Sequence, residues 1–128
     1  MVIGTSRTAK PWVRWGLRAA TTLVALDAYA QAVLAGRFLS GDVGMLLGHR
    51  YNGAEGVASL SVVLIVMAVI AWRAGQVSGH LVALSVTLTG LVALQVAMGF
   101  NRVLGVHIPL GVGIIALATV LAVWAWRR

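Results

Sequence analysis

The sequence contains no cysteine and only three acidic residues among 128. The absence of cysteine excludes disulfides, thiolate metal sites, iron–sulfur clusters and heme attached covalently through a CxxCH motif. Charged residues make up 10% of the chain, whereas hydrophobic residues make up 60%. A soluble domain of this size cannot bury so much apolar surface, so the composition indicates a single integral membrane domain over residues 1–128.

Four long apolar stretches predict the fold. They cover residues 17–39, 45–72, 79–100 and 106–126, and each is close to or above the roughly 20 residues that a helix needs to cross the hydrocarbon core. The short loops between them predict an all-α membrane protein, an antiparallel bundle of four transmembrane helices. The run 28–30 is similar to a signal-peptide cleavage site, but Asp27 interrupts the apolar stretch before it, so we expect the first span to be retained.

The net charge of +7 comes from basic residues near the ends of the spans. At these positions they indicate membrane topology and contact with lipid headgroups rather than nucleic acid. One side of the predicted bundle carries Arg7, Lys10, Arg14, Arg18, Arg73, Arg127 and Arg128. The other side carries only Arg37, Arg50 and Arg102. The positive-inside rule therefore predicts a multi-pass protein of the plasma membrane with both termini in the cytoplasm, and the five tryptophans fall at the predicted cytoplasmic interface.

The two halves of the chain share a degenerate repeat. The pattern H-x-x-x-G occurs at His49–Gly53 and again at His107–Gly111, 58 residues later. Gln31 precedes the first pattern and Gln95 the second, each near the end of the preceding span. Two helical hairpins of equal topology predict a pseudo-two-fold axis along the membrane normal. The two glutamines are expected to form hydrogen bonds between helices.

The repeat predicts a site between the second and fourth helices. The axis makes His49 and His107 equivalent, so their imidazoles are expected to face each other across the bundle at the extracytoplasmic level. Two neutral imidazoles supply the two axial ligands of one heme iron. Gly53 and Gly111 lie one turn further along on the same faces, where a side chain would strike the porphyrin. The sequence therefore predicts one non-covalent heme b per chain, with His49 and His107 as the metal ligands.

The three basic residues on the same side complete this prediction. Arg50, together with Arg37 and Arg102, is expected to pair with the heme propionates. His80 lies at the opposite side without a partner, so only one heme is expected.

Two other interpretations of the histidine pair stay open. Both residues could be interface histidines that bind only water and headgroups, or a copper site could use Met45 or Met98.

This arrangement resembles one four-helix half of the heme A synthase family and, more loosely, small b-type membrane cytochromes. The residues that carry the resemblance are His49-Arg50, the run 94–99 at the end of the third span, and His107. The resemblance implies a four-helix unit that presents one histidine from its second helix and one from its fourth. Heme A synthases have two such halves, a glutamate where this chain has Leu46, and often a cysteine pair. The departures argue against full heme A synthase activity.

These observations favour electron transfer or heme handling over a stand-alone enzyme, because two protein ligands leave no open position on the iron. The expected partners are the lipid bilayer, a quinol or an extracytoplasmic redox protein, and a second copy, since a homodimer would recreate the eight-helix plan implied by the resemblance.

An alternative function is centred on Asp27, an acidic residue in the middle of the first span. A carboxyl group at this depth is costly and suggests a cofactor-free small transporter or an accessory subunit of a membrane complex. A structural role is also open, in which Asp27 donates a hydrogen bond to one of the third-span hydroxyls. These hydroxyls belong to Ser85, Thr87 and Thr89. Pro109 is expected in the first turn of the fourth helix, where its missing N–H costs little.

Overall fold

The computed structural model describes residues 10–128, so Arg7 lies outside the described residues. Helices make up most of this part of the chain, and it contains no strand. The elements in chain order are α1 (Pro11–Leu39), α2 (Met45–Tyr51), η1 (Asn52–Val57), α3 (Ala58–Arg73), α4 (Gly79–Phe100) and α5 (Leu104–Trp126). Here η1 is a π-helical segment that joins α2 and α3 into one span, Met45–Arg73.

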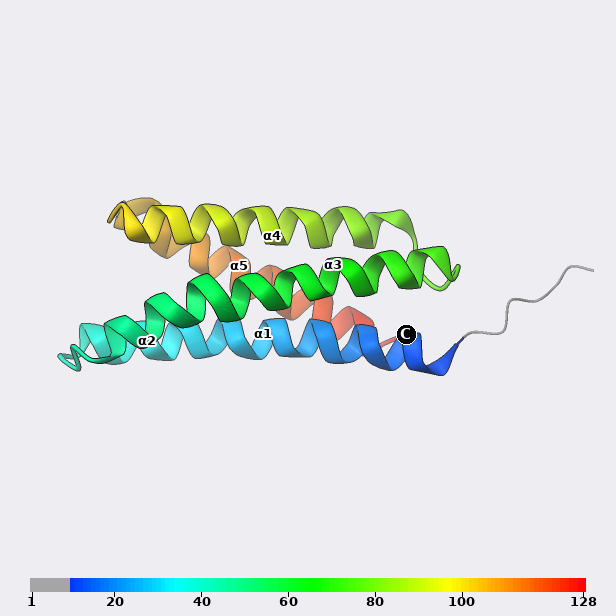
Figure 1. The fold of residues 1–128 in the computed structure, drawn as a ribbon, viewed down its shortest axis with the longest axis horizontal. Helices are drawn as coiled ribbons and strands as arrows, with labels where there is room; N and C mark the ends of the chain where they lie inside the picture. The colour runs from blue at the N-terminus through cyan, green and yellow to red at the C-terminus, as the bar shows by residue number, and fades with distance from the viewer. Residues whose placement is uncertain (1–9) are drawn as a thin grey trace, which may run out of the picture.

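Four helical segments are long and apolar enough to cross a membrane, which indicates a multi-pass membrane protein. Figure 1 shows them side by side, with the α1–α2 and α4–α5 turns at one end of the molecule and the α3–α4 turn at the other. α1 packs against α3 and α5, and α4 packs against the same two helices. The span that contains α2, η1 and α3 is therefore diagonal to α5 across the bundle.

Small side chains and leucines form the contacts between the helices. The buried residues of the second span recur at intervals of three and four, namely Val57, Ser61, Leu64, Ala68 and Ala71. α4 and α5 follow the same spacing. This spacing keeps one seam of each helix facing its neighbours, and small residues on the seam let the backbones approach closely.

The buried residues occupy only one part of the bundle. They lie within residues 13–28 of α1, 57–71 of the second span, 81–92 of α4 and 114–125 of α5. α2 contains no buried residue. The close-packed core therefore stops before the end of the bundle that holds the α1–α2 and α4–α5 turns.

The three turns between the spans have the same backbone conformation, but the residue at their left-handed position is glycine in two turns and arginine in the third. After α1, α3 and α4 the chain enters the left-handed region at Gly41 (φ 103°), Gly75 (φ 72°) and Arg102 (φ 57°). Backbone N–H groups of each turn bond back to the last helical carbonyls, as in a Schellman motif. Glycine adopts this conformation without strain, whereas Arg102 carries a Cβ that makes it costly.

Two local expectations differ from the structure. Pro109 lies inside α5 rather than in its first turn, because the helix already begins at Leu104, where the N–H groups of Val106 and His107 bond the carbonyl of Val103. The prolyl nitrogen therefore leaves the Gly105 carbonyl without its helical partner. The second span is not a continuous α-helix, because η1 interrupts it at Asn52.

Candidate functional site

The structure brings His49 and His107 together. His49 lies on α2 and His107 in the first turns of α5, on the two spans that face each other diagonally. Their ring centroids are 6.0 Å apart and their planes are inclined by 81°. Both side chains are half-buried, at the end of the bundle beyond the close-packed core. Two histidines 58 residues apart thus form a pair inside a membrane bundle.

Each imidazole is held by the backbone of the glutamine that precedes it in the repeat. His49 Nδ1 lies 3.2 Å from the carbonyl oxygen of Gln31, and His107 Nδ1 lies 2.9 Å from that of Gln95. A carbonyl oxygen only accepts, so each Nδ1 carries the proton and donates it. The Nε2 atom is then the nitrogen of each ring whose lone pair can accept a hydrogen bond or bind a metal. Histidines that bind metals are commonly oriented in this way.

The spacing of the two rings is that of an edge-to-face ring contact, and it is also compatible with a shared metal ion. A metal bound at about 2 Å by one nitrogen of each imidazole places the two ring centroids about 6 Å apart. Among residues 10–128 no group of three or more His, Cys, Asp or Glu side chains could hold an ion alone. A macrocycle that supplies its own equatorial ligands needs two protein ligands, which is the number that this pair offers.

Glutamine side chains cover the two repeat glycines. A Cβ at Gly53 would lie 3.6 Å from the amide atoms of Gln31, and a Cβ at Gly111 would lie 2.8 Å from Nε2 of Gln95. The Gln95 amide also reaches Nε2 of His107 at 3.4 Å. Nε2 of Gln31 and Oε1 of Gln95 are buried without a hydrogen-bond partner. A planar group that displaced these flexible amides would therefore break few hydrogen bonds, and the residues present fit a heme.

A third glycine, which lies outside the H-x-x-x-G pattern, touches the site directly. A Cβ at Gly99 of α4 would lie 2.8 Å from Cε1 and 3.1 Å from Nδ1 of His107. The imidazole is rigid and bonded to the Gln95 carbonyl, so it has little freedom to move away. Gly99 therefore makes room for His107, a role that sequence reasoning did not assign to it.

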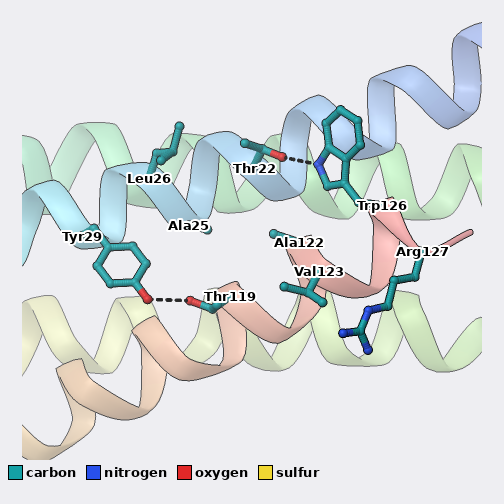
Figure 2. A pocket seen from close by; sticks show the side chains of 9 residues that line it. All are labelled: Thr22, Ala25, Leu26, Tyr29, Thr119, Ala122, Val123, Trp126 and Arg127. Atoms are coloured by element: carbon teal, nitrogen blue, oxygen red, sulfur yellow. Dashed lines mark hydrogen bonds between the residues drawn. The ribbon is translucent and has the colours of Figure 1, made fainter.

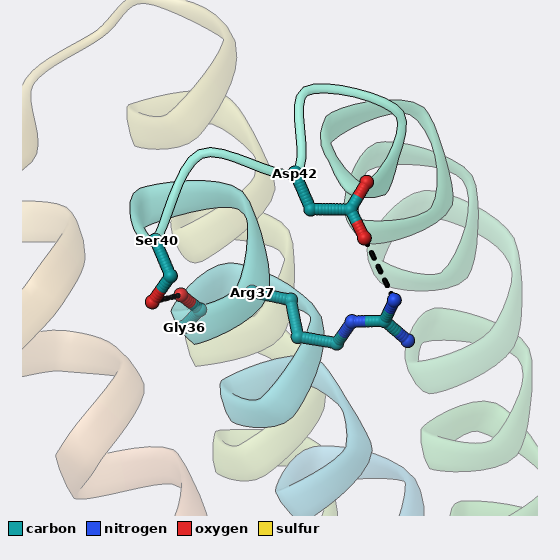
Figure 3. A network of polar contacts seen from close by, with 4 residues as sticks. All are labelled: Gly36, Arg37, Ser40 and Asp42. Atoms are coloured by element: carbon teal, nitrogen blue, oxygen red, sulfur yellow. Dashed lines mark hydrogen bonds and ion pairs between the residues drawn. The ribbon is translucent and has the colours of Figure 1, made fainter.

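The predicted arginines have different surroundings. Arg37 donates from Nη2 to Oδ2 of Asp42 at 2.7 Å within the α1–α2 turn, as Figure 3 shows, so its charge is already paired. The Arg50 guanidinium lies 4.6 Å from the centroid of the Phe100 ring, which ties α2 to the end of α4. Arg102 is exposed in the strained α4–α5 turn. His80 lies at the start of α4, at the opposite end of the bundle.

Asp27 bonds a residue that was not expected to be its partner. Its Oδ1 accepts a hydrogen bond from Nδ2 of Asn52 at 2.8 Å. The third-span hydroxyls do not bond it, because Ser85 and Thr89 donate to backbone carbonyls of their own helix and Thr87 lies on the exposed side of α4. Oδ2 of Asp27 is buried without a partner, facing Gly56. The suggested bond to α4 is therefore wrong.

Sequence reasoning missed two polar residues of the second span, Asn52 and Glu55. Both lie in η1, and Glu55 is exposed. The signal was available, since they are an amide and an acid within an otherwise apolar span.

A separate groove runs between α1 and α5, nearer the other end of the bundle. Its volume is about 470 Å³, and Figure 2 shows two hydrogen bonds across it. Trp126 donates to the Thr22 hydroxyl, and the Tyr29 and Thr119 hydroxyls bond each other. The side chains that line the groove are otherwise mostly apolar, and they include none of the predicted site residues. At the same end Arg18 stacks on Trp15 and Trp126, with its Cζ 5.1 and 5.0 Å from the ring centroids.

The chain matches no protein-family model, no curated protein and no solved structure.

Proposed function

We propose that this chain is a small b-type heme-binding protein of the plasma membrane, with one non-covalent heme near the extracytoplasmic face. The observation that carries the proposal is the pair His49 and His107, with ring centroids 6.0 Å apart and each Nδ1 held by a glutamine carbonyl. Both features come from equivalent positions of the two repeats. If the two histidines met only by chance at the interface, there would be no reason for each to bond the carbonyl of an equivalent glutamine on the preceding span.

His49 and His107 are the residues that would hold the iron of a heme, and a bound heme would supply a reversible one-electron couple. With both histidines as protein ligands, the group would serve electron transfer or heme handling rather than oxygen chemistry. Arg102 and Arg50 are exposed on the same side, and they would balance propionate charge. Arg50 would do so while its guanidinium lies over the Phe100 ring, or after leaving it. Arg37 would have to exchange its bond to Asp42 for one to a propionate.

The proposal includes the arrangement of the hairpins and their orientation in the membrane. The four spans form an antiparallel bundle of two hairpins related by a pseudo-two-fold axis, and both termini lie in the cytoplasm. The Gln31–His49 and Gln95–His107 hydrogen bonds support the axis, because each hairpin makes the same contact. Similarity to one half of the heme A synthases fits this plan without implying their reaction. The electron partners are a quinol in the bilayer or a redox protein outside it.

The test is the heme content of histidine variants purified in detergent. We expect His49→Ala and His107→Ala each to lose at least nine-tenths of the reduced α band, since one ligand alone holds the iron weakly. His80→Ala is the matched control, because His80 has the same chemistry at the opposite end of α4, and it should keep the wild-type spectrum. Wild-type heme content in both single variants would refute the proposal.

A second candidate is supported by Asp27. Its Oδ2 is buried without a partner, and only Asn52 bonds its other oxygen. A cofactor-free transporter, or an accessory subunit of a larger membrane complex, would use such a carboxyl as its polar centre. This alternative predicts a colourless protein that takes up no added hemin. It also predicts that Asp27→Asn abolishes the cellular phenotype of the chain, while His49→Ala and His107→Ala leave it unchanged.

A further inference from the structure

The first hairpin carries polar residues that the second one lacks. With the histidines in register, Asn52 and Glu55 correspond to Leu110 and Gly113. With the glutamines in register, Asp27 corresponds to Leu91. The histidines and the glutamines that bond them therefore occur in both hairpins, whereas Asp27 and Glu55 have no counterpart in the second hairpin. We infer that these two acids have a role other than holding the histidine pair.

Glu55 is the acid whose position is hardest to explain within a single chain. Asp27 bonds Asn52 and Asp42 bonds Arg37, whereas Glu55 makes no hydrogen bond or ion pair with residues 10–128. Its side chain is exposed. It lies ten residues past Met45, or about 15 Å along a span of 29 residues. With the span centred in a hydrocarbon core of about 30 Å, Glu55 lies about 8 Å inside that core. A carboxyl group exposed there faces lipid, where it is costly unless a partner covers it.

The surface around Glu55 is a continuous stripe on one side of the second span. Its members are spaced three or four residues apart and are all exposed: Leu47, Tyr51, Glu55, Ser59, Val62 and Val66. Hydroxyl groups thus lie one turn before and one turn after the carboxyl, at Tyr51 and Ser59. The stripe offers donors and an acceptor between apolar ends, so it is chemically complementary to itself.

We propose that this face packs against the same face of a second copy, about a two-fold axis along the membrane normal. Copies inserted in the same orientation place equivalent residues at equal depth, so the two Glu55 side chains meet near the axis. There each carboxyl bonds the other carboxyl, when one is protonated, or a hydroxyl of Tyr51 or Ser59 of the second copy. The valines pack below them. The proposal is independent of heme binding, so each can fail without the other.

Disulfide crosslinking in native membranes tests the face, because the chain has no cysteine of its own. Val62→Cys and Val66→Cys should each form a disulfide-linked dimer on mild oxidation. Val120→Cys is the matched control, since Val120 is 63% exposed on α5, outside the stripe, and should stay monomeric. Equal crosslinking at the three positions, or crosslinks only to a different protein, would overturn the proposal.

Dilution of fluorescently labelled protein in detergent tests the role of Glu55. Replacing Glu55 by Leu should weaken the dimer about tenfold, since a hydrogen-bonded pair in a membrane contributes on that scale. Glu55→Gln keeps a self-complementary donor and acceptor and should stay within about threefold of the wild type. A monomeric wild-type protein, or an unchanged dimer in Glu55→Leu, would contradict the proposal. If Glu55→Leu does not fold, crosslinking of the Val62→Cys and Val66→Cys variants still tests whether this face forms the dimer.

Discussion

At the residue scale, two glycines of α4 differ sharply in what a methyl group would meet. A Cβ at Gly90 meets nothing within 4 Å, whereas one at Gly99 would come within 2.8 Å of the His107 ring. Gly90→Ala should therefore stabilise the protein by about 0.5–1 kcal/mol, the usual gain in a helix interior. Gly99→Ala should destabilise it by about 1–3 kcal/mol, the cost of overpacking, and displace the imidazole.

Thermal unfolding and the ratio of heme to protein measure both variants. Heme content should fall at least fivefold in Gly99→Ala and stay unchanged in Gly90→Ala. If the two alanine variants behave alike, Gly99 has no part in placing His107.

Arg102 occupies a left-handed position that glycine fills in the other two turns. Arg102→Gly should raise the free energy of unfolding of the heme-free protein by about 1 kcal/mol, because the strain of the Cβ disappears. It should also speed heme loss to an excess of a heme-scavenging protein severalfold, because the charge near the propionates is gone. Arg102→Lys keeps charge and strain and should resemble the wild type. Equal rates of heme loss in all three proteins would remove Arg102 from the site.

The sequence predicts the contact of a residue only where the internal repeat specifies its partner. The repeat in the sequence placed His49 and His107 on facing spans, and the structure brings them together. The hydrogen-bond partner of Asp27 could not be predicted from the repeat, because Asp27 has no counterpart in the second hairpin. Which side chain meets Asp27 depends on the rotation of the second span about its axis, and hydropathy does not specify that rotation. The structure turns Asn52 toward it, and not a hydroxyl of α4.

At the element scale, the π-helical segment η1 sets the phase of α2 relative to α3. Deleting Ala54 from η1 should convert the span into a regular α-helix and rotate His49 by about 100° away from His107. We expect loss of the heme spectrum with unchanged helix content by circular dichroism. Ala54→Ser, which keeps the number of residues, should bind heme normally. Full heme content in the deletion variant would show that η1 does not position His49.

The sequence predicts the four apolar spans, but it does not predict the break within the second of them. The runs are unambiguous, and helices of the structure cover all four of them. The break at Asn52 has no comparable signal, because Asn, Gly, Ala, Glu and Gly fit a weak α-helix as well as a π-helix. The position of Pro109 was misjudged because α5 begins in the turn before it, where backbone bonds to Val103 start the helix early.

At the scale of the whole molecule, the orientation in the membrane is directly testable with introduced cysteines. Val43→Cys lies in the α1–α2 turn and Ser78→Cys before α4, at opposite ends of the bundle. With the termini in the cytoplasm, a membrane-impermeant maleimide should label Val43→Cys in intact cells and Ser78→Cys only after lysis. The cysteine-free wild type is the control. The reverse pattern would place the histidine pair on the cytoplasmic side.

The whole bundle has a close-packed core at one end and a histidine pair held by two glutamine carbonyls at the other. The measurement that tests this account most directly is the absorption spectrum of the wild-type protein in detergent, oxidised and then reduced with dithionite, with a pyridine hemochrome assay. The account predicts a sharp reduced α band and about one heme b per chain. A colourless protein that also fails to take up added hemin would contradict it.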